Sequence, residues 1–115
     1  MSALILPFGD ASPTIDLSAW LAPTATVIGQ ATIAADASVF FGAVVRADMD
    51  RIELGTGVSV GSNTTVLYDT KIGDYAQLGP LTIVMRGESI PGHSEWGGAP
   101  AVPVLHEPAP MKLAA

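Results

Sequence analysis

Aliphatic residues recur at every sixth position along most of the chain. Six positions form a first series and, after a slip of three residues, seven more form a second: Ile15, Leu21, Val27, Ile33, Val39 and Val45, then Leu54, Val60, Val66, Ile72, Leu78, Val84 and Ile90. A period of six matches neither an amphipathic helix nor a simple alternating strand. It fits a short strand followed by a corner, so that three units of about 18 residues close one triangular coil with the aliphatic residues pointing inward.

A second column supports this interpretation. Small or short residues stand four positions after the aliphatic ones: Ala25, Ala31, Ala37, Ala43, Val58, Thr64, Thr70, Ala76 and Thr82. Glycine often follows the aliphatic residue directly, at Gly55, Gly61, Gly73 and Gly79. Small side chains fit tight corners, and glycine tolerates the positive φ that corners often need. The two columns together form a hexapeptide repeat.

The repeat predicts an all-β, single-domain parallel β-helix of four to five triangular coils. The predicted coils cover residues 15–32, 33–53, 54–71 and 72–89, and Ile90 opens a fifth. Residues 1–14 are expected to be a lead-in, residues 15–96 the β-helix and residues 97–115 an extended tail. The tail contains Pro100, Pro103, Pro108 and Pro110, and proline does not continue a helix.

The slip in the repeat falls within residues 46–53, so three extra residues are expected to bulge out at one corner. Such an insertion is either a plain surface loop or part of a binding face. It carries Asp48, Asp50 and Glu53, whose oxygens could bind a hard cation, although a solvated acidic surface is the simpler interpretation. Asp69 and Asp74 lie near predicted corners and are expected to cap turns.

Many apolar residues lie outside the inward column, which predicts an oligomer. Hydrophobic residues make up 49% of the chain and charged residues only 14%, with a mean hydropathy of +0.43. The apolar residues outside the column include Trp20, Ile28, Phe40, Phe41, Val44, Leu67, Tyr68, Leu81, Ile83 and Met85. A surface of that kind usually marks an interface, and a closed homotrimer suits parallel prisms. The alternative is scattered surface apolar residues.

Charge and composition exclude several classes of function. The net charge is −6 with five cations, which cannot build the basic patch of a nucleic-acid-binding protein. The longest strongly apolar run, residues 39–45, is far shorter than the ~20 residues of a membrane span. There is no cysteine. The N-terminal sequence lacks the positive region of a secretion signal, so a cytoplasmic location is expected.

The first half resembles the γ-class carbonic-anhydrase-like proteins, through residues 15–29 (IDLSAWLAPTATVIG) and 39–48 (VFFGAVVRAD). The resemblance implies a left-handed β-helix. It also implies that Arg46 and Asp48 form an ion pair across a trimer interface, beside a metal site.

Active members of that family hold zinc with three histidines. The resemblance places Leu67, Pro80 and Met85 at those three positions, and Gly61 at a glutamine of the catalytic pocket. None of the three is a plausible zinc ligand. No zinc or other cofactor is therefore expected, and a structural or binding role is favoured.

The second half resembles the hexapeptide segment of nonribosomal-peptide-synthetase-like proteins of the poly-lysine synthetase type. The matching stretches are residues 66–70 (VLYDT), 78–88 (LGPLTIVMRGE) and 96–101 (WGGAPA). The N-terminal half of the chain thus resembles one family, and its C-terminal half resembles the C-terminal segment of another. A natural protein and an engineered fusion are both consistent with that pattern.

The two histidines, His93 and His106, are the remaining candidates for chemistry. His93 lies in a predicted turn two residues before Glu95, and such a pair can act as an oriented general base. This supports two alternatives. The first is an accessory of acyl or aminoacyl transfer. The second is a carbonic anhydrase with relocated metal ligands, and a trimer could bring three copies of His93 together to bind the metal. The plainer interpretation is an exposed turn histidine. His106 lies in the proline-rich tail and is expected to be inert.

The aromatic side chains complete the set of candidates. Tyr68, Tyr75 and Trp96 are expected to be packing residues rather than platforms for a ligand.

Overall fold

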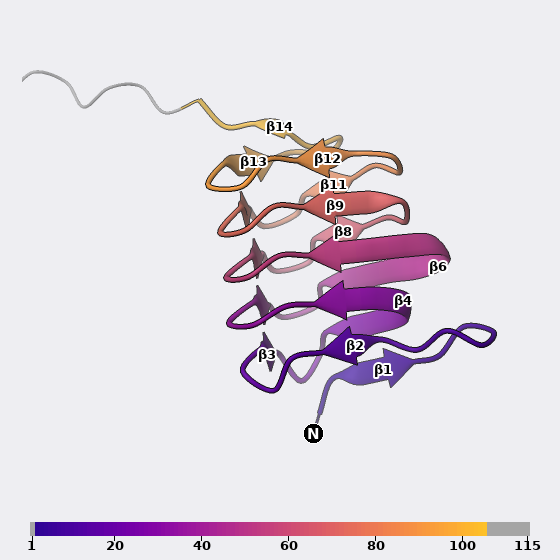
Figure 1. The fold of residues 1–115 in the computed structure, drawn as a ribbon. Coiled ribbons are helices and arrows are strands. Elements are labelled where there is room, and N and C mark those ends of the chain that lie inside the picture. Colours follow the sequence, from indigo (N-terminus) through magenta and orange to yellow (C-terminus); the bar gives the residue numbers. More distant parts are fainter. Residues whose placement is uncertain (1, 106–115) are drawn as a thin grey trace, which may run out of the picture.

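The computed structural model describes residues 2–105, and these residues form a triangular prism built of stacked coils (Figure 1). The strands are β1 (Leu4–Leu6), β2 (Thr14–Ile15), β3 (Trp20–Leu21), β4 (Thr26–Ile33), β5 (Ser38–Val39), β6 (Val44–Leu54), β7 (Ser59–Val60), β8 (Thr65–Val66), β9 (Thr70–Ile72), β10 (Gln77–Leu78), β11 (Ile83–Val84), β12 (Ser89–Ile90), β13 (Glu95–Gly97) and β14 (Val102–Pro103). Within this part of the chain, no helix has the length and apolarity that crossing a bilayer requires.

Parallel strands form the three faces of the prism, and the first two faces belong to one eight-stranded sheet because β4 and β6 run through the corner between them. The first face contains β1, the beginning of β4, the beginning of β6, β8 and β11. The second face contains β2, the ends of β4 and β6, β9 and β12. The third face contains β3, β5, β7, β10 and β13. The chain turns at a first corner between the first and second faces, a second corner between the second and third, and a third corner leading back to the first.

The predicted inward column is confirmed. All of its members from Val27 to Ile90 are buried, while Ile15 and Leu21 in the lowest coil are partly buried against the core. The column of small residues is buried as well, including Thr64 and Thr82. Their hydroxyls each donate to the carbonyl oxygen of Gly79, at 2.7 and 2.8 Å, which supplies the partner that a buried hydroxyl needs.

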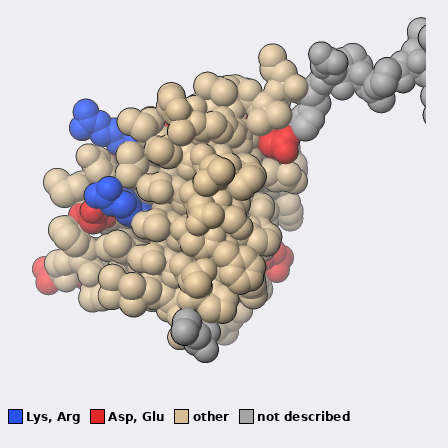
Figure 2. Space-filling view, turned by 180° about the vertical axis from the view of Figure 1, so that it is seen from behind, with Lys and Arg blue, Asp and Glu red and all other residues tan. Residues whose placement is uncertain are grey.

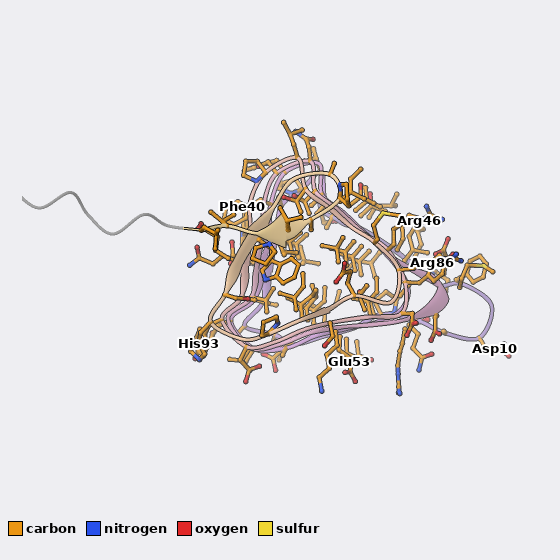
Figure 3. The ribbon with its side chains drawn as sticks, turned by 90° about the horizontal axis from the view of Figure 1, so that it is seen from above. Asp10, Phe40, Arg46, Glu53, Arg86 and His93 are labelled. Atoms are coloured by element: carbon orange, nitrogen blue, oxygen red, sulfur yellow. The ribbon has the colours of Figure 1, made fainter. Side chains whose placement is uncertain are left out.

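The helix of coils is left-handed, as the resemblance implied. In Figure 3, seen from above, Phe40, Arg46, Glu53 and His93 follow one another clockwise while the chain rises toward the viewer. The third face contributes one strand to each of the five coils, from β3 to β13.

The predicted bulge lies at the first corner. β4 and β6 pair in register up to Gly29 and Ala47, and then resume at Ala31 and Ile52. Between those points β6 has three more residues than β4. The insertion therefore leaves both flanking faces in register, with the extra residues projecting from the corner.

The two ends of the prism differ. At the C-terminal end, Trp96 packs on the core, and β14 pairs antiparallel with β13 instead of continuing outward. The predicted tail thus begins with a strand that returns along the third face, while residues 106–115 lie outside the described range. At the N-terminal end, β1 pairs beneath β4, so the predicted lead-in contributes a strand to the first coil. Ile5 points inward there and is 48% exposed.

Candidate functional site

The outer surface of the first face is largely apolar. Side chains alternate along each strand, so two outward columns follow from the register: Leu4, Thr26, Val44, Thr65 and Ile83, and beside it Leu6, Ile28, Arg46, Leu67 and Met85. Most members are aliphatic, and Met85 is 44% exposed. Arg46 is the one charged residue of the two columns.

The third corner extends this apolar surface. Trp20 makes edge-on contacts with Phe40 and Phe41, with ring centroids 5.5 and 5.8 Å apart, and Leu81 is exposed at the same corner. Most of the apolar residues predicted to face outward gather on the first face and the third corner. Other exposed apolar residues lie at the first and second corners, among them Met49 and Leu17. We refer to the first face and the third corner together as the apolar side.

The three positions at which the resemblance places zinc ligands lie on this side. Leu67 follows β8 and Met85 follows β11, one coil above it on the same outward column. Pro80 follows β10 at the third corner. A leucine and a proline side chain have no donor atom for a metal, and a thioether is too soft to hold zinc.

Gly61 occupies a position with no room for a side chain. A Cβ atom there would lie 2.6 Å from the carbonyl carbon of Gly79 and 2.7 Å from the carbonyl oxygen of Leu78. Backbone atoms of the next coil cannot move aside as a flexible side chain can. The glutamine of the resembled family is therefore excluded by the tight stacking of this chain at that point.

Arg46 and Asp48 form an ion pair within one chain. The guanidinium Nη2 donates to Oδ2 of Asp48 at 2.9 Å, and the two side chains are 43% and 17% exposed. This hydrogen bond, opposed in part by burial, lowers the pKa of Asp48 from its ordinary value near 3.8. The second oxygen, Oδ1, is buried and has no hydrogen-bond partner in residues 2–105. Contact of the pair with a neighbouring subunit stays a prediction.

The acidic residues of the bulge do not converge. Asp50 Oδ1 accepts a hydrogen bond from the Arg51 N–H at 2.7 Å, and Glu53 faces outward on the second face. The described range contains no group of three His, Cys, Asp or Glu residues that could hold a metal ion. This favours a solvated acidic surface over a cation site.

The two predicted turn caps also have clear positions. Asp74 Oδ1 accepts a hydrogen bond from the Thr56 N–H of the coil below at 2.9 Å, so its predicted capping role is confirmed. Asp69 lies at the first corner with a φ of 57°, a backbone conformation that aspartate tolerates better than most residues.

His93 lies at the second corner, across the prism from the first face (Figure 3). Its ring stacks on that of Tyr75 in the coil below, with centroids 5.2 Å apart and planes at 26°. The Tyr75 ring in turn lies over Gly57, where any Cβ atom would collide with it. His93 and Glu95 both line an open hollow of about 780 Å³, and their action as an oriented general base stays a prediction.

Sequence reasoning assigned Tyr75 to packing, but its side chain is 52% exposed and lines this hollow. The sequence feature that indicates this position is the spacing of 18 residues between Tyr75 and His93, because one full coil of that length puts both residues at one corner. Trp96 is a packing residue, as predicted, and Tyr68 is half-buried at the first corner. His106 lies outside the described residues.

Comparison with known proteins supports both resemblances. The chain is 44% identical over 57 residues, half of its length, to the delta-poly-L-ornithine synthetase of Acinetobacter baumannii. It is 32% identical over 85 residues, 65% of its length, to the mitochondrial gamma carbonic anhydrase 2 of Arabidopsis thaliana. The chain spans only 4% and 31% of those two proteins. No family model matches.

A solved structure supports the fold. A hexapeptide transferase family protein from Anaplasma phagocytophilum superposes with a TM-score of 0.61, covering 92% of this chain and 86% of its own. At 22% sequence identity this likeness establishes the architecture, a hexapeptide-repeat β-helix, and not the activity.

Proposed function

We propose that this hexapeptide-repeat protein, similar in sequence to γ carbonic anhydrases, is a non-catalytic trimer that binds no zinc and serves a structural or binding role. The observation that carries the proposal is the pair Leu67 and Met85. They stand one above the other on the outward column that also holds Arg46. Hydrocarbon and thioether side chains at those places supply packing surface and no ligand set.

The apolar side supports the trimer. Exposed aliphatic side chains on the first face and an aromatic group at the third corner form a surface of the kind that associates in water. The first face of one subunit would pack near the third corner of the next. This arrangement would place Pro80 of one subunit toward Leu67 and Met85 of another. It would also cover the ion pair of Arg46 and Asp48.

Metal analysis of untagged protein, paired with a gain-of-ligand variant, tests the proposal. Wild-type protein is expected to contain no stoichiometric zinc and to show no hydration of CO₂. The variant Leu67→His, Pro80→His, Met85→His is expected to take up about one zinc per subunit if the three positions meet across an interface. A wild-type zinc content of about one per subunit, with CO₂ hydration abolished in His93→Ala, would overturn the proposal.

A second candidate function is a role in acyl or aminoacyl transfer. It is favoured by His93 and Glu95, which line one hollow, and by the similarity to a poly-ornithine synthetase. The position of His93 argues against this function, because the second corner, where His93 lies, is the corner farthest from the apolar side and from the proposed subunit interface. Acetyl-CoA should raise the melting temperature of wild-type protein and not of His93→Ala if this function is correct. Equal melting curves with and without acetyl-CoA would exclude it.

A cytoplasmic location stays a prediction of the N-terminal sequence. The Arabidopsis relatives are named as mitochondrial proteins. Fractionation of cells that produce the full-length protein decides between the compartments.

A further inference from the structure

The hollow at the second corner has a lining unlike that of any other part of the prism. One wall is the stacked pair of Tyr75 and His93, whose rings are exposed to solvent. The opposite wall is apolar and comes from Pro103 and Val104, which the antiparallel strand β14 brings back along β13. The Val104 N–H donates to the Glu95 carbonyl oxygen at 2.8 Å, which holds this wall against the third face.

Among residues 2–105, the Lys, Arg, Asp and Glu side chains nearest this hollow are all acidic. Glu95 lines it, and Asp74 lies beside Tyr75 at the same corner. The four cations of residues 2–105 lie elsewhere: Arg46 on the first face, Arg51 and Arg86 at the first corner, and Lys71 on the second face. In Figure 2, the blue side chains lie at one edge together with red ones, while the red side chains on the opposite edge have no blue neighbours. The field of the protein therefore attracts cations to the second corner.

The polar groups of the lining favour a ligand that donates hydrogen bonds. Ser94 Oγ donates to the Pro91 carbonyl oxygen and accepts from Trp96 Nε1, so the hydroxyl is already engaged. The Glu95 carboxylate can only accept hydrogen bonds, while the Gln77 amide can accept or donate, so the carboxylate sets the preference. A carboxylate has room for several hydrogen bonds, so Glu95 can receive another donor beside its present interaction.

We propose that this hollow binds an alkylammonium ligand, a linear diamine or polyamine. The ammonium group contacts the Glu95 carboxylate and the outer face of the His93 ring, which the Tyr75 ring supports from the coil below. The alkyl stem packs on Val104 and Pro103. The inference does not depend on the trimer, because the hollow lies within one chain and away from the apolar side.

The test is a titration of ¹⁵N-labelled full-length protein with spermidine at pH 8, followed by amide chemical shifts. Saturable shifts are expected at residues of the second corner and of β13. A neutral chain of similar length, 1,8-octanediol, is expected to bind much more weakly. Glu95→Gln should weaken spermidine binding about fivefold, the effect of an ion pair near the surface. Tyr75→Asn, which suits the positive φ at that position, removes the ring that supports His93 and should weaken binding about threefold.

The matched control is Glu88→Gln, which removes a carboxylate at the first corner, near Lys71 and away from the hollow. This variant should bind spermidine as the wild type does. Shifts spread evenly over all acidic residues, equal binding of the diol, or an unchanged affinity in Glu95→Gln would each overturn the proposal. Sedimentation of the same samples reports the assembly state separately, so failure of the trimer and failure of the amine site are distinguishable.

Discussion

The first and second faces of the prism have matching interiors and contrasting exteriors. Inside, the first face stacks valines from Val27 to Val84, and the second stacks larger aliphatic residues from Ile33 to Ile90. Outside, the first face is mainly apolar, with two threonines and one arginine. The outward column of the second face, in contrast, holds Thr14, Thr32, Glu53, Lys71 and Ser89.

This contrast separates two physical roles within one repeat. Inward residues are buried in any coil of this kind, and each buried aliphatic side chain contributes about 1.5–3 kcal/mol to folding. Outward residues contribute little to the single prism. On the second face they interact with water, while on the first face they leave apolar area exposed that a neighbouring subunit can cover. The difference between the faces therefore concerns association and not folding.

The largest effect is expected from a charge placed inside either face. Val66→Asp in the first face and Ile72→Asp in the second should each lose more than about 4 kcal/mol, because the carboxylate has no partner in the core. Far-ultraviolet circular dichroism and thermal melting should show both variants unfolded. If only one of the two variants remained folded, the interiors of the first and second faces would not be equivalent.

A charge placed outside should instead distinguish the faces. Ile83→Lys and Ser89→Lys lie outward on consecutive strands of one coil, β11 on the first face and β12 on the second. Ile83→Lys should weaken the trimer by about 3 kcal/mol or more, since an unpaired ammonium would be buried at the interface. Ser89→Lys should leave it intact. Sedimentation velocity measures the assembly state of both variants. If both remained trimers, the interface would not lie on the first face.

The smallest effect concerns the ion pair on the first face. Because the pKa of Asp48 is lowered in the folded protein, its stabilisation is present above about pH 4 and is lost as the pH falls through the folded pKa. The pair is partly exposed in one chain, so its loss should cost less than about 1 kcal/mol.

Denaturant titrations at pH 5 and pH 3 measure this effect by comparing wild type with Asp48→Asn. The wild type should lose more stability between the two pH values. Asp16, whose pKa is also lowered, by hydrogen bonds from the Ser18 N–H and hydroxyl, is present in both proteins and cancels in the comparison. Equal losses in the two proteins would mean that the Arg46 pair contributes nothing to folding.

The sequence by itself determined the stack of triangular coils, because a period of six with small residues at the corners fits a short strand and a turn; the left hand of the helix came only from the family resemblance. It placed the inward column from Val27 to Ile90, the bulge within residues 46–53 and the outward direction of most of the other apolar residues. It also paired His93 with Glu95. These features depend on local spacing and on the alternation of side chains along a strand.

Only the tertiary structure decided which outward residues become neighbours. The stacking of Tyr75 on His93, the ion pair of Arg46 and Asp48 within one chain and the absence of room at Gly61 depend on how whole coils are superposed. The return of β14 along β13, which builds one wall of the hollow, depends on closure of the C-terminal end. Contacts of this kind join residues that are separated by a full coil or by a chain reversal, so they are set by coil closure and packing rather than by the period of the repeat.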